Sequence, residues 1–150
     1  MQRFKSFAIG LIALALVAAP SFSAAERSEE FGEFQVHYNA LTTGLIEPSV
    51  ARAYGIIRSK HRALINIAVL RRVMGTPAKP VQAVVKVEAV NLSAQLRSIE
   101  MRELSDAGAI YYIGEFPISN NDNLTFNVEV TPDGSETAHA ISFKQEFFTD

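Results

Sequence analysis

Residues 124–131 read Leu-Thr-Phe-Asn-Val-Glu-Val-Thr, in which apolar and polar side chains alternate without a break. Successive side chains of a β-strand point to opposite faces of the sheet, so the alternation predicts a strand that is buried on one face and exposed on the other. In this register the side chain of Phe126 is buried and that of Asn127 is exposed. This is the clearest strand in the chain, and its neighbours follow the same pattern.

Six other segments show the same period of two or its fully buried counterpart. They cover Phe34–Asn39, Leu64–Leu70, Val81–Ala89, Arg97–Leu104, Ala109–Phe116 and Ile141–Phe147. Turn signals separate several of them. Pro132-Asp-Gly134 is the best defined, because proline presets φ, aspartate bonds locally and glycine accepts positive φ. About seven short strands with turns at this spacing predict an antiparallel β-sandwich.

Residues 47–55, Glu-Pro-Ser-Val-Ala-Arg-Ala-Tyr-Gly, depart from the strand pattern and predict a short helix between the first two strands. Pro48 suits the first helical position, and Gly55 suits the end. Val50 and Tyr54 are four residues apart, so both side chains can face the core. One inserted helical turn is compatible with a sandwich.

The first 25 residues have the layout of a secretory signal peptide: Arg3 and Lys5, then an uncharged run over residues 7–19, then Ser-Phe-Ser-Ala-Ala at 21–25. We expect cleavage after Ala25, with cleavage after Ser23 as the alternative. An uncleaved anchor fits less well, because a spanning helix needs roughly 20 apolar residues. The sequence therefore predicts a protein exported to the periplasm that does not span the membrane after cleavage.

The composition excludes several classes of protein. The chain has 150 residues and no cysteine, which rules out disulfide scaffolds, thiolate metal sites and cysteine nucleophiles. Removing residues 1–25 takes away two cations and no acid, so the net charge goes from −2 to −4. An acidic chain lacks the basic footprint of a nucleic-acid binder, and we expect no nucleic-acid partner.

Four stretches together resemble a known family: Phe-Gly-Glu-Phe-Gln-Val-His-Tyr-Asn at 31–39, Ala-Tyr-Gly-Ile-Ile-Arg-Ser-Lys-His-Arg at 53–62, Ala-Ile-Tyr-Tyr-Ile-Gly-Glu-Phe-Pro at 109–117 and Phe-Lys-Gln-Glu-Phe at 143–147. The family is the exported proteobacterial domain of unknown function 4426. The resemblance covers nearly all of the mature chain, and its most distinctive parts are residues 37–39 and 54–62. It implies a periplasmic protein with an immunoglobulin-like sandwich. It implies no activity and supplies no catalytic residues.

Residues and resemblance together lead to one expectation for the fold. We expect an all-β, immunoglobulin-like antiparallel β-sandwich of about seven strands with one short helix after the first strand. Residues 26–150 form this single domain, and residues 1–25 are the cleaved signal peptide.

Candidate metal and catalytic groups are few. None of the histidines His37, His61 and His139 has a partner at the spacing of three or four that places two ligands on one helix face. His37 and His139 can meet only if the first and last strands pair, so they are weak metal candidates, and we expect no metal or other cofactor. Ser59 and His61 lie two apart in an extended segment, where side chains run parallel and form no relay. The sequence therefore predicts a protein that is not an enzyme.

The alternating cations Arg58, Lys60 and Arg62 are the one local concentration of charge that stands out from the average composition of the chain. In an extended segment they share one face and form a patch that attracts anions. The simpler interpretation is a solvated strand edge, where Lys and Arg prevent edge-to-edge aggregation. We favour the simpler interpretation and keep the patch as a speculative binding site.

The function we expect is that of a periplasmic, non-catalytic binding or interaction module. Its partner is an envelope protein or an anionic envelope component, and its oligomeric state stays open. The alternative is a small-ligand or metal-binding protein with His37 and His139 as candidates. A deep pocket with convergent polar groups favours the alternative. A flat surface with an apolar or basic patch favours the interaction module.

Overall fold

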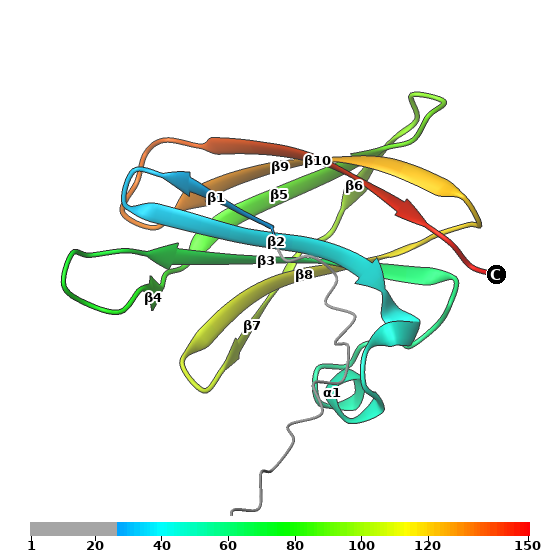
Figure 1. Ribbon diagram of the computed structural model, residues 1–150, viewed down its shortest axis with the longest axis horizontal. Helices are drawn as coiled ribbons and strands as arrows, with labels where there is room; N and C mark the ends of the chain where they lie inside the picture. Colours follow the sequence, from blue (N-terminus) through cyan, green and yellow to red (C-terminus); the bar gives the residue numbers. More distant parts are fainter. Residues whose placement is uncertain (1–26) are drawn as a thin grey trace, which may run out of the picture.

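Two antiparallel sheets face each other in the computed structural model, which describes residues 27–150 (Figure 1). The predicted signal peptide and its cleavage site after Ala25 lie outside the described residues. The strands are β1 (Arg27–Phe31), β2 (Phe34–Thr42), β3 (Arg62–Arg71), β4 (Lys79–Pro80), β5 (Ala83–Val90), β6 (Leu96–Ile99), β7 (Arg102–Asp106), β8 (Ala109–Pro117), β9 (Asp122–Pro132) and β10 (His139–Phe147). The helical elements are the 3-10 helix η1 (Thr43–Leu45) and the α-helix α1 (Pro48–Ala53).

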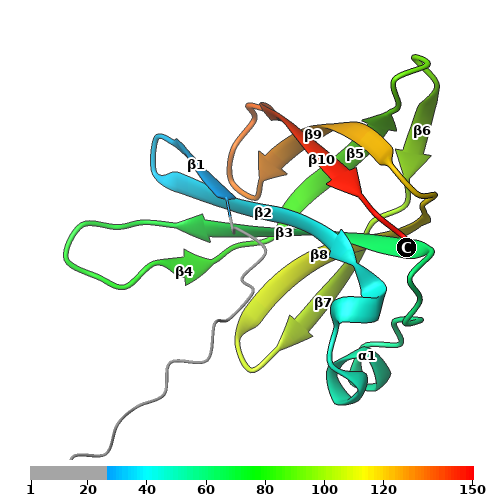
Figure 2. The same cartoon turned by 45° about the vertical axis from the view of Figure 1, so that its right-hand side comes forward.

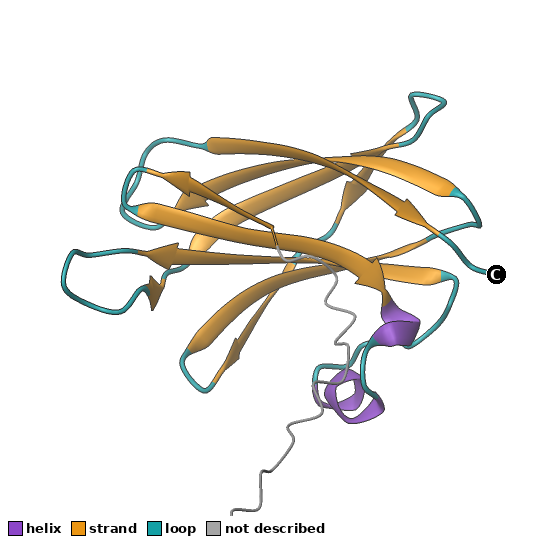
Figure 3. Ribbon diagram, viewed as in Figure 1, coloured by secondary structure: helices purple, strands orange, loops and turns teal. Residues whose placement is uncertain are grey.

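The order of the strands is that of an immunoglobulin domain. The first sheet runs β1-β2-β3-β8-β7, with β4 paired to β3, and the second sheet runs β10-β9-β5-β6. The orders β2-β3-β8-β7 and β10-β9-β5-β6 correspond to strands A-B-E-D and G-F-C-C′ of that fold. The predicted all-β sandwich is therefore confirmed. Helix is confined, within the described residues, to the connection between β2 and β3 (Figure 3).

The core lies between the sheets and is filled by alternate residues of the long strands. Phe126 of β9 is fully buried, whereas Asn127 is exposed, as the alternation predicts. The Phe126 ring lies 5.0 Å from that of Phe143 and 5.5 Å from that of Phe116, measured between centroids. Aromatic pairs at this separation add to the free energy of burial, so Phe126 sits at the energetic centre of the sandwich.

The structure has ten strands within residues 27–150, not about seven. β1 was not predicted because its Arg-Ser-Glu-Glu-Phe sequence is mostly charged; pairing with β2 along its whole length makes it a strand. β4 is a two-residue strand that pairs with β3. The helix consequently follows the second strand rather than the first.

The predicted strand over residues 97–104 is two strands in two sheets. β6 ends at Ile99 and pairs with β5, whereas β7 begins at Arg102 and pairs with β8. Ile99 is buried and Met101 packs against the core as the chain crosses the edge of the sandwich. Alternate residues therefore continue to face the core where the chain passes from one sheet to the other. For this reason the alternation by itself does not reveal the change of sheet.

The described residues contain no helix with the length and apolarity needed to cross a bilayer.

Candidate functional site

Residues 43–61, which connect β2 to β3 and include η1 and α1, form a strap on the outer face of the first sheet. β2 and β3 are antiparallel neighbours, a pair that a short hairpin turn can join. The chain instead makes an excursion, and Figure 2 shows α1 beside β8 and β7. The strap therefore adds a layer that the two-sheet sandwich does not require.

Backbone groups at the two ends of the strap are joined by Thr43, whose side chain is fully buried. Its hydroxyl donates to the carbonyl oxygen of Ile57 at 2.8 Å and accepts the N–H of Ser59 at 3.0 Å. The guanidinium of Arg58 donates to the carbonyl oxygens of Ile46 at 2.6 Å and Gly44 at 2.9 Å. These bonds close the strap into a compact unit.

Polar contacts also attach the strap to the sheet. The hydroxyl of Tyr54 donates to Asp106 at 2.5 Å, and the guanidinium of Arg102 donates to the carbonyl oxygen of Tyr54 at 2.7 Å. Glu115 accepts the N–H of Ile57 at 3.3 Å and forms an ion pair with Arg62 at 3.6 Å. The hydrogen bond to Asp106 raises the pKa of Tyr54, because the neutral phenol is the form that donates to the carboxylate.

A groove with a volume of about 370 Å³ lies between the strap and the sheet, and we call it the strap groove. The strap side supplies Ile46, Val50, Tyr54 and Ile56; the sheet side supplies Asn39, Leu41, Leu64, Asn66, Leu104, Tyr111 and Ile113. Leu64 and Ile113 point away from the main core, yet they are buried because the strap covers them. Val50 remains exposed at the rim of the groove, and Leu45 and Ile57 are exposed elsewhere on the strap.

Asn39 and Asn66 are the two amides of the groove. They lie directly opposite each other on β2 and β3. The Oδ1 atom of each is shielded from solvent and has no hydrogen-bond partner among the described residues. A buried acceptor without a partner destabilises a protein by about 1–3 kcal/mol, so two adjacent ones form an unusual feature. The groove thus contains two unused acceptors just beneath its apolar surface, and a ligand reaches them once the two side chains turn toward it.

Sequence reasoning did not single out these amides, although a signal was present. Asn66 is the one polar residue in the apolar run from Leu64 to Leu70, where a central strand is expected to be apolar on both faces. Asn39 lies within the distinctive stretch His37-Tyr38-Asn39. Their juxtaposition depends on the register of β2 against β3, which the sequence pattern does not specify.

The three predicted cations do not share a strand face. β3 begins only at Arg62, and residues 58–61 form a loop and turn whose course is set by the bonds between Thr43 and Ser59. Arg58 is bonded within the strap, Arg62 pairs with Glu115, and Lys60 is exposed in the turn. The extended basic face that the alternation predicts is therefore absent from residues 58–62, because the segment before Arg62 is not a strand.

The two histidines considered as metal ligands lie on different sheets. β2 and β10 do not pair, and His37 faces away from the core because Val36 and Tyr38 on either side are buried. His139 is partly buried, and its ring is stacked on that of Phe31 with 4.5 Å between the centroids. No three His, Asp or Glu side chains between residues 27 and 150 converge as metal ligands.

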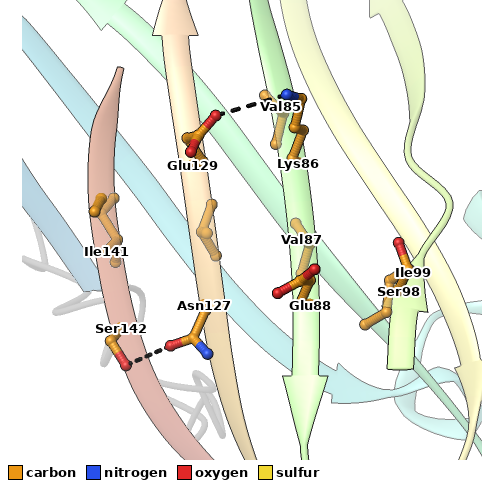
Figure 4. A pocket seen from close by; sticks show the side chains of 12 residues that line it. Val85, Lys86, Val87, Glu88, Ser98, Ile99, Asn127, Glu129, Ile141 and Ser142 are labelled. Carbon is orange, nitrogen blue, oxygen red and sulfur yellow. Dashed lines mark hydrogen bonds and ion pairs between the residues drawn. The ribbon is translucent and has the colours of Figure 1, made fainter. Parts of the chain in front are cut away.

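A larger hollow of about 490 Å³ lies on the second sheet (Figure 4). Its outward-facing polar side chains already pair across the strands. Lys86 lies 3.8 Å from Glu129, and Ser142 donates to Asn127 at 3.1 Å. This hollow follows the surface of a sheet and contains no unsatisfied buried acceptor among the described residues. The strap groove is therefore the stronger candidate for a binding site.

Comparisons with known proteins identify the family of this chain. The sequence profile of one family, described as Domain of unknown function (DUF4426), matches residues 28–150. The crystal structure of a DUF4426 family protein from Pseudomonas aeruginosa PAO1 is 37% identical, with a TM-score of 0.72, and the match covers 86% of this chain and 98% of that one. Comparison with curated proteins gives no significant match.

Two further solved structures share the fold at low identity. FetP of uropathogenic Escherichia coli strain F11, expressed recombinantly in the periplasm, is 12% identical with a TM-score of 0.58 over 83% of this chain and 94% of FetP. A copper-bound single-residue variant of FetP is 13% identical with a TM-score of 0.56 over 81% of this chain and 93% of the variant. At such identities the likeness shows a common fold and nothing about ligands.

Proposed function

The chain belongs to the DUF4426 family, and from that premise we propose that it is a non-catalytic binding module of the periplasm that holds an apolar partner in the strap groove. The observation that carries the proposal is the pair of unsatisfied amide oxygens of Asn39 and Asn66 in an apolar groove. Ligand sites combine apolar walls with a few placed polar groups in this way.

The energetics of the groove support a role in binding. If the strap served only to stabilise the sheet, apolar residues at positions 39 and 66 would serve better, because burying an unpaired acceptor is unfavourable. Natural proteins depart from such local rules mainly at functional sites. A partner that donates hydrogen bonds to the two amides would remove the unfavourable contribution.

The open form of the groove favours a macromolecular partner over an enclosed small molecule. The side chain of Val50 is exposed at the rim of the groove, and those of Leu45 and Ile57 are exposed elsewhere on the strap. Contiguous exposed apolar surface is a mark of interaction sites. A segment of an envelope protein is therefore our choice of partner, in place of the anionic component that the basic run suggested.

Export and the absence of catalysis are parts of the same proposal. Export is supported by the signal-peptide pattern of residues 1–25. A hydroxyl–imidazole relay has no support at residues 59–61, because the Ser59 hydroxyl accepts the backbone N–H of His61. The metal-binding alternative has less support, since His37 faces away from the core whereas the ring of His139 stacks on Phe31. The copper bound to the FetP variant therefore does not enter the proposal.

Site-specific photo-crosslinking in exporting cells tests the proposal. A benzophenone amino acid replaces Val50 at the rim of the groove or, as a matched control, the exposed Val84 on β5 of the second sheet. We expect a covalent adduct from position 50 and none from position 84. The variant Leu104→Trp fills the groove and should abolish the adduct. No adduct from position 50, equal adducts from both positions, or an adduct that survives Leu104→Trp contradicts the proposal.

A further inference from the structure

The hydrogen-bonding capacity of the strap groove restricts the chemistry of what it holds. Both unsatisfied atoms are amide oxygens, one on Asn39 and one on Asn66, and both are acceptors. The two residues are cross-strand partners, whose Cβ atoms are about 4.5–5.5 Å apart in an antiparallel pair. A ligand toward which both amides turn must therefore bring N–H or O–H donors close together.

The charges around the groove indicate that the contacting part of the ligand is neutral. None of the residues that line the groove is Asp, Glu, Lys, Arg or His. The charged groups nearby are already engaged, because Glu115 lies between Arg62 and Arg102 and Asp106 accepts the hydroxyl of Tyr54. A phosphate, a carboxylate or a metal ion would therefore enter an apolar site without a compensating charge, which is strongly unfavourable.

The walls of the groove determine the rest of the ligand. They are aliphatic or aromatic except for the two amides, and Val50, Tyr54 and Tyr111 lie at least partly open to solvent. A sugar ring carries hydroxyl groups around its whole edge, and most of these would find no partner here. A peptide combines apolar side chains with neutral main-chain N–H groups, so it satisfies both the walls and the amides.

We infer that the strap groove binds an extended peptide segment of a partner protein, with apolar side chains against the strap and main-chain N–H groups donated to Asn39 and Asn66. This inference rests on the proposed function and specifies its partner. Along an extended chain, alternate residues direct their N–H groups to the same side at about 6.6 Å, twice the rise per residue. Two Asn side chains that start about 5 Å apart reach both N–H groups if they turn toward the peptide and diverge slightly.

Selection of peptides from a random display library on the purified protein tests the inference. The enriched peptides, selected without counter-selection, are then measured against the double variant Asn39→Leu/Asn66→Leu, in which the groove keeps its apolar walls and loses both acceptors. We expect enriched peptides rich in apolar residues. Their affinity should fall about tenfold or more in the double variant, as expected when two hydrogen bonds of ordinary net strength are lost. The matched control Asn127→Leu changes an exposed amide of the second sheet and should leave the affinity unchanged.

A second measurement does not depend on how the variants fold. N-methylation of single main-chain amides in an enriched peptide removes one donor at a time, and two positions separated by one residue should each weaken binding to the unchanged protein. Enriched peptides that bind the double variant equally well, or that tolerate every N-methylation, overturn the inference. So does a concentration-dependent dimer that Leu104→Trp abolishes, because a second copy would then occupy the groove.

The two levels of the proposal can fail separately. If position 50 gives its groove-dependent adduct in cells but no peptide depends on the Asn pair, the binding module stands and the peptide inference is wrong. If position 50 gives no adduct and no peptide is enriched, both are wrong.

Discussion

Replacing Asn66 by leucine should make the protein more stable while it weakens binding in the strap groove. The Oδ1 atom of Asn66 is buried without a partner, and such a group destabilises the folded state by about 1–3 kcal/mol. Leucine has a similar size and places apolar atoms beside Leu64 and Ile113. Part of the gain is lost because the side chain of Asn66 is only half-buried. We therefore expect the free energy of unfolding to rise by about 1–2 kcal/mol.

Chemical denaturation followed by far-UV circular dichroism measures this change, since the chain has no tryptophan to report by fluorescence. The denaturation midpoint should rise without a change in m-value, and Tm should rise by about 4 °C for each kcal/mol. Asn127→Leu is the control. Its amide is exposed and accepts the Ser142 hydroxyl, so we expect a change within about 0.5 kcal/mol.

A loss of stability in Asn66→Leu would refute the reasoning. It would mean that the amide makes contacts that the fold requires, and the argument that Asn39 and Asn66 are kept for a ligand would fail with it. A gain in stability accompanied by weaker binding is the signature of a residue retained for function at the expense of stability.

Three other predictions concern the core, the strap and export. Phe126→Ala empties the centre of the sandwich and should lower the free energy of unfolding by about 3–5 kcal/mol, as measured by urea denaturation; a cost below about 1 kcal/mol would contradict the assigned core. Arg58→Gln removes two hydrogen bonds to carbonyl groups of the strap. It should lower the free energy of unfolding by about 1–2 kcal/mol and speed amide hydrogen exchange in residues 43–61, whereas the control Lys60→Gln should change neither. Equal effects of the two substitutions would show that the positive charge matters and the hydrogen bonds do not. The exported protein should begin at Glu26, which intact-mass measurement decides, and a membrane-bound product that retains Met1 would disprove cleavage.

Much of the fold could be predicted because alternation is a local property of the chain. The inward face of β9, with Phe126 buried and Asn127 exposed, follows from the period of two. The same period failed at residues 97–104, because the chain crosses from one sheet to the other while Ile99 and Met101 both keep to the core. β1 was missed because its charged sequence becomes a strand only through pairing with β2.

The candidate site was less predictable, because its residues come from distant parts of the chain. The alternation of Arg58, Lys60 and Arg62 suggested a shared face, but hydrogen bonds between Thr43 and Ser59 turn the segment into a loop. A sequence pattern assigns side chains to faces only where the backbone is regular. Inside the strap, long-range bonds determine the backbone, so the basic face did not form.

The amino-acid sequence by itself determined that this protein is an all-β sandwich and which residues of its regular strands face inward. The reason is that side chains alternate between the two faces of a strand, and the hydrophobic effect buries the face that carries the apolar ones. Only the tertiary structure decided that the strap covers Leu64 and Ile113 on the outer face of the first sheet and leaves a groove above Asn39 and Asn66. The physical reason is that periodicity specifies the two faces of a strand, whereas the strand register and the layer that covers an outer face arise from contacts between residues far apart in the chain.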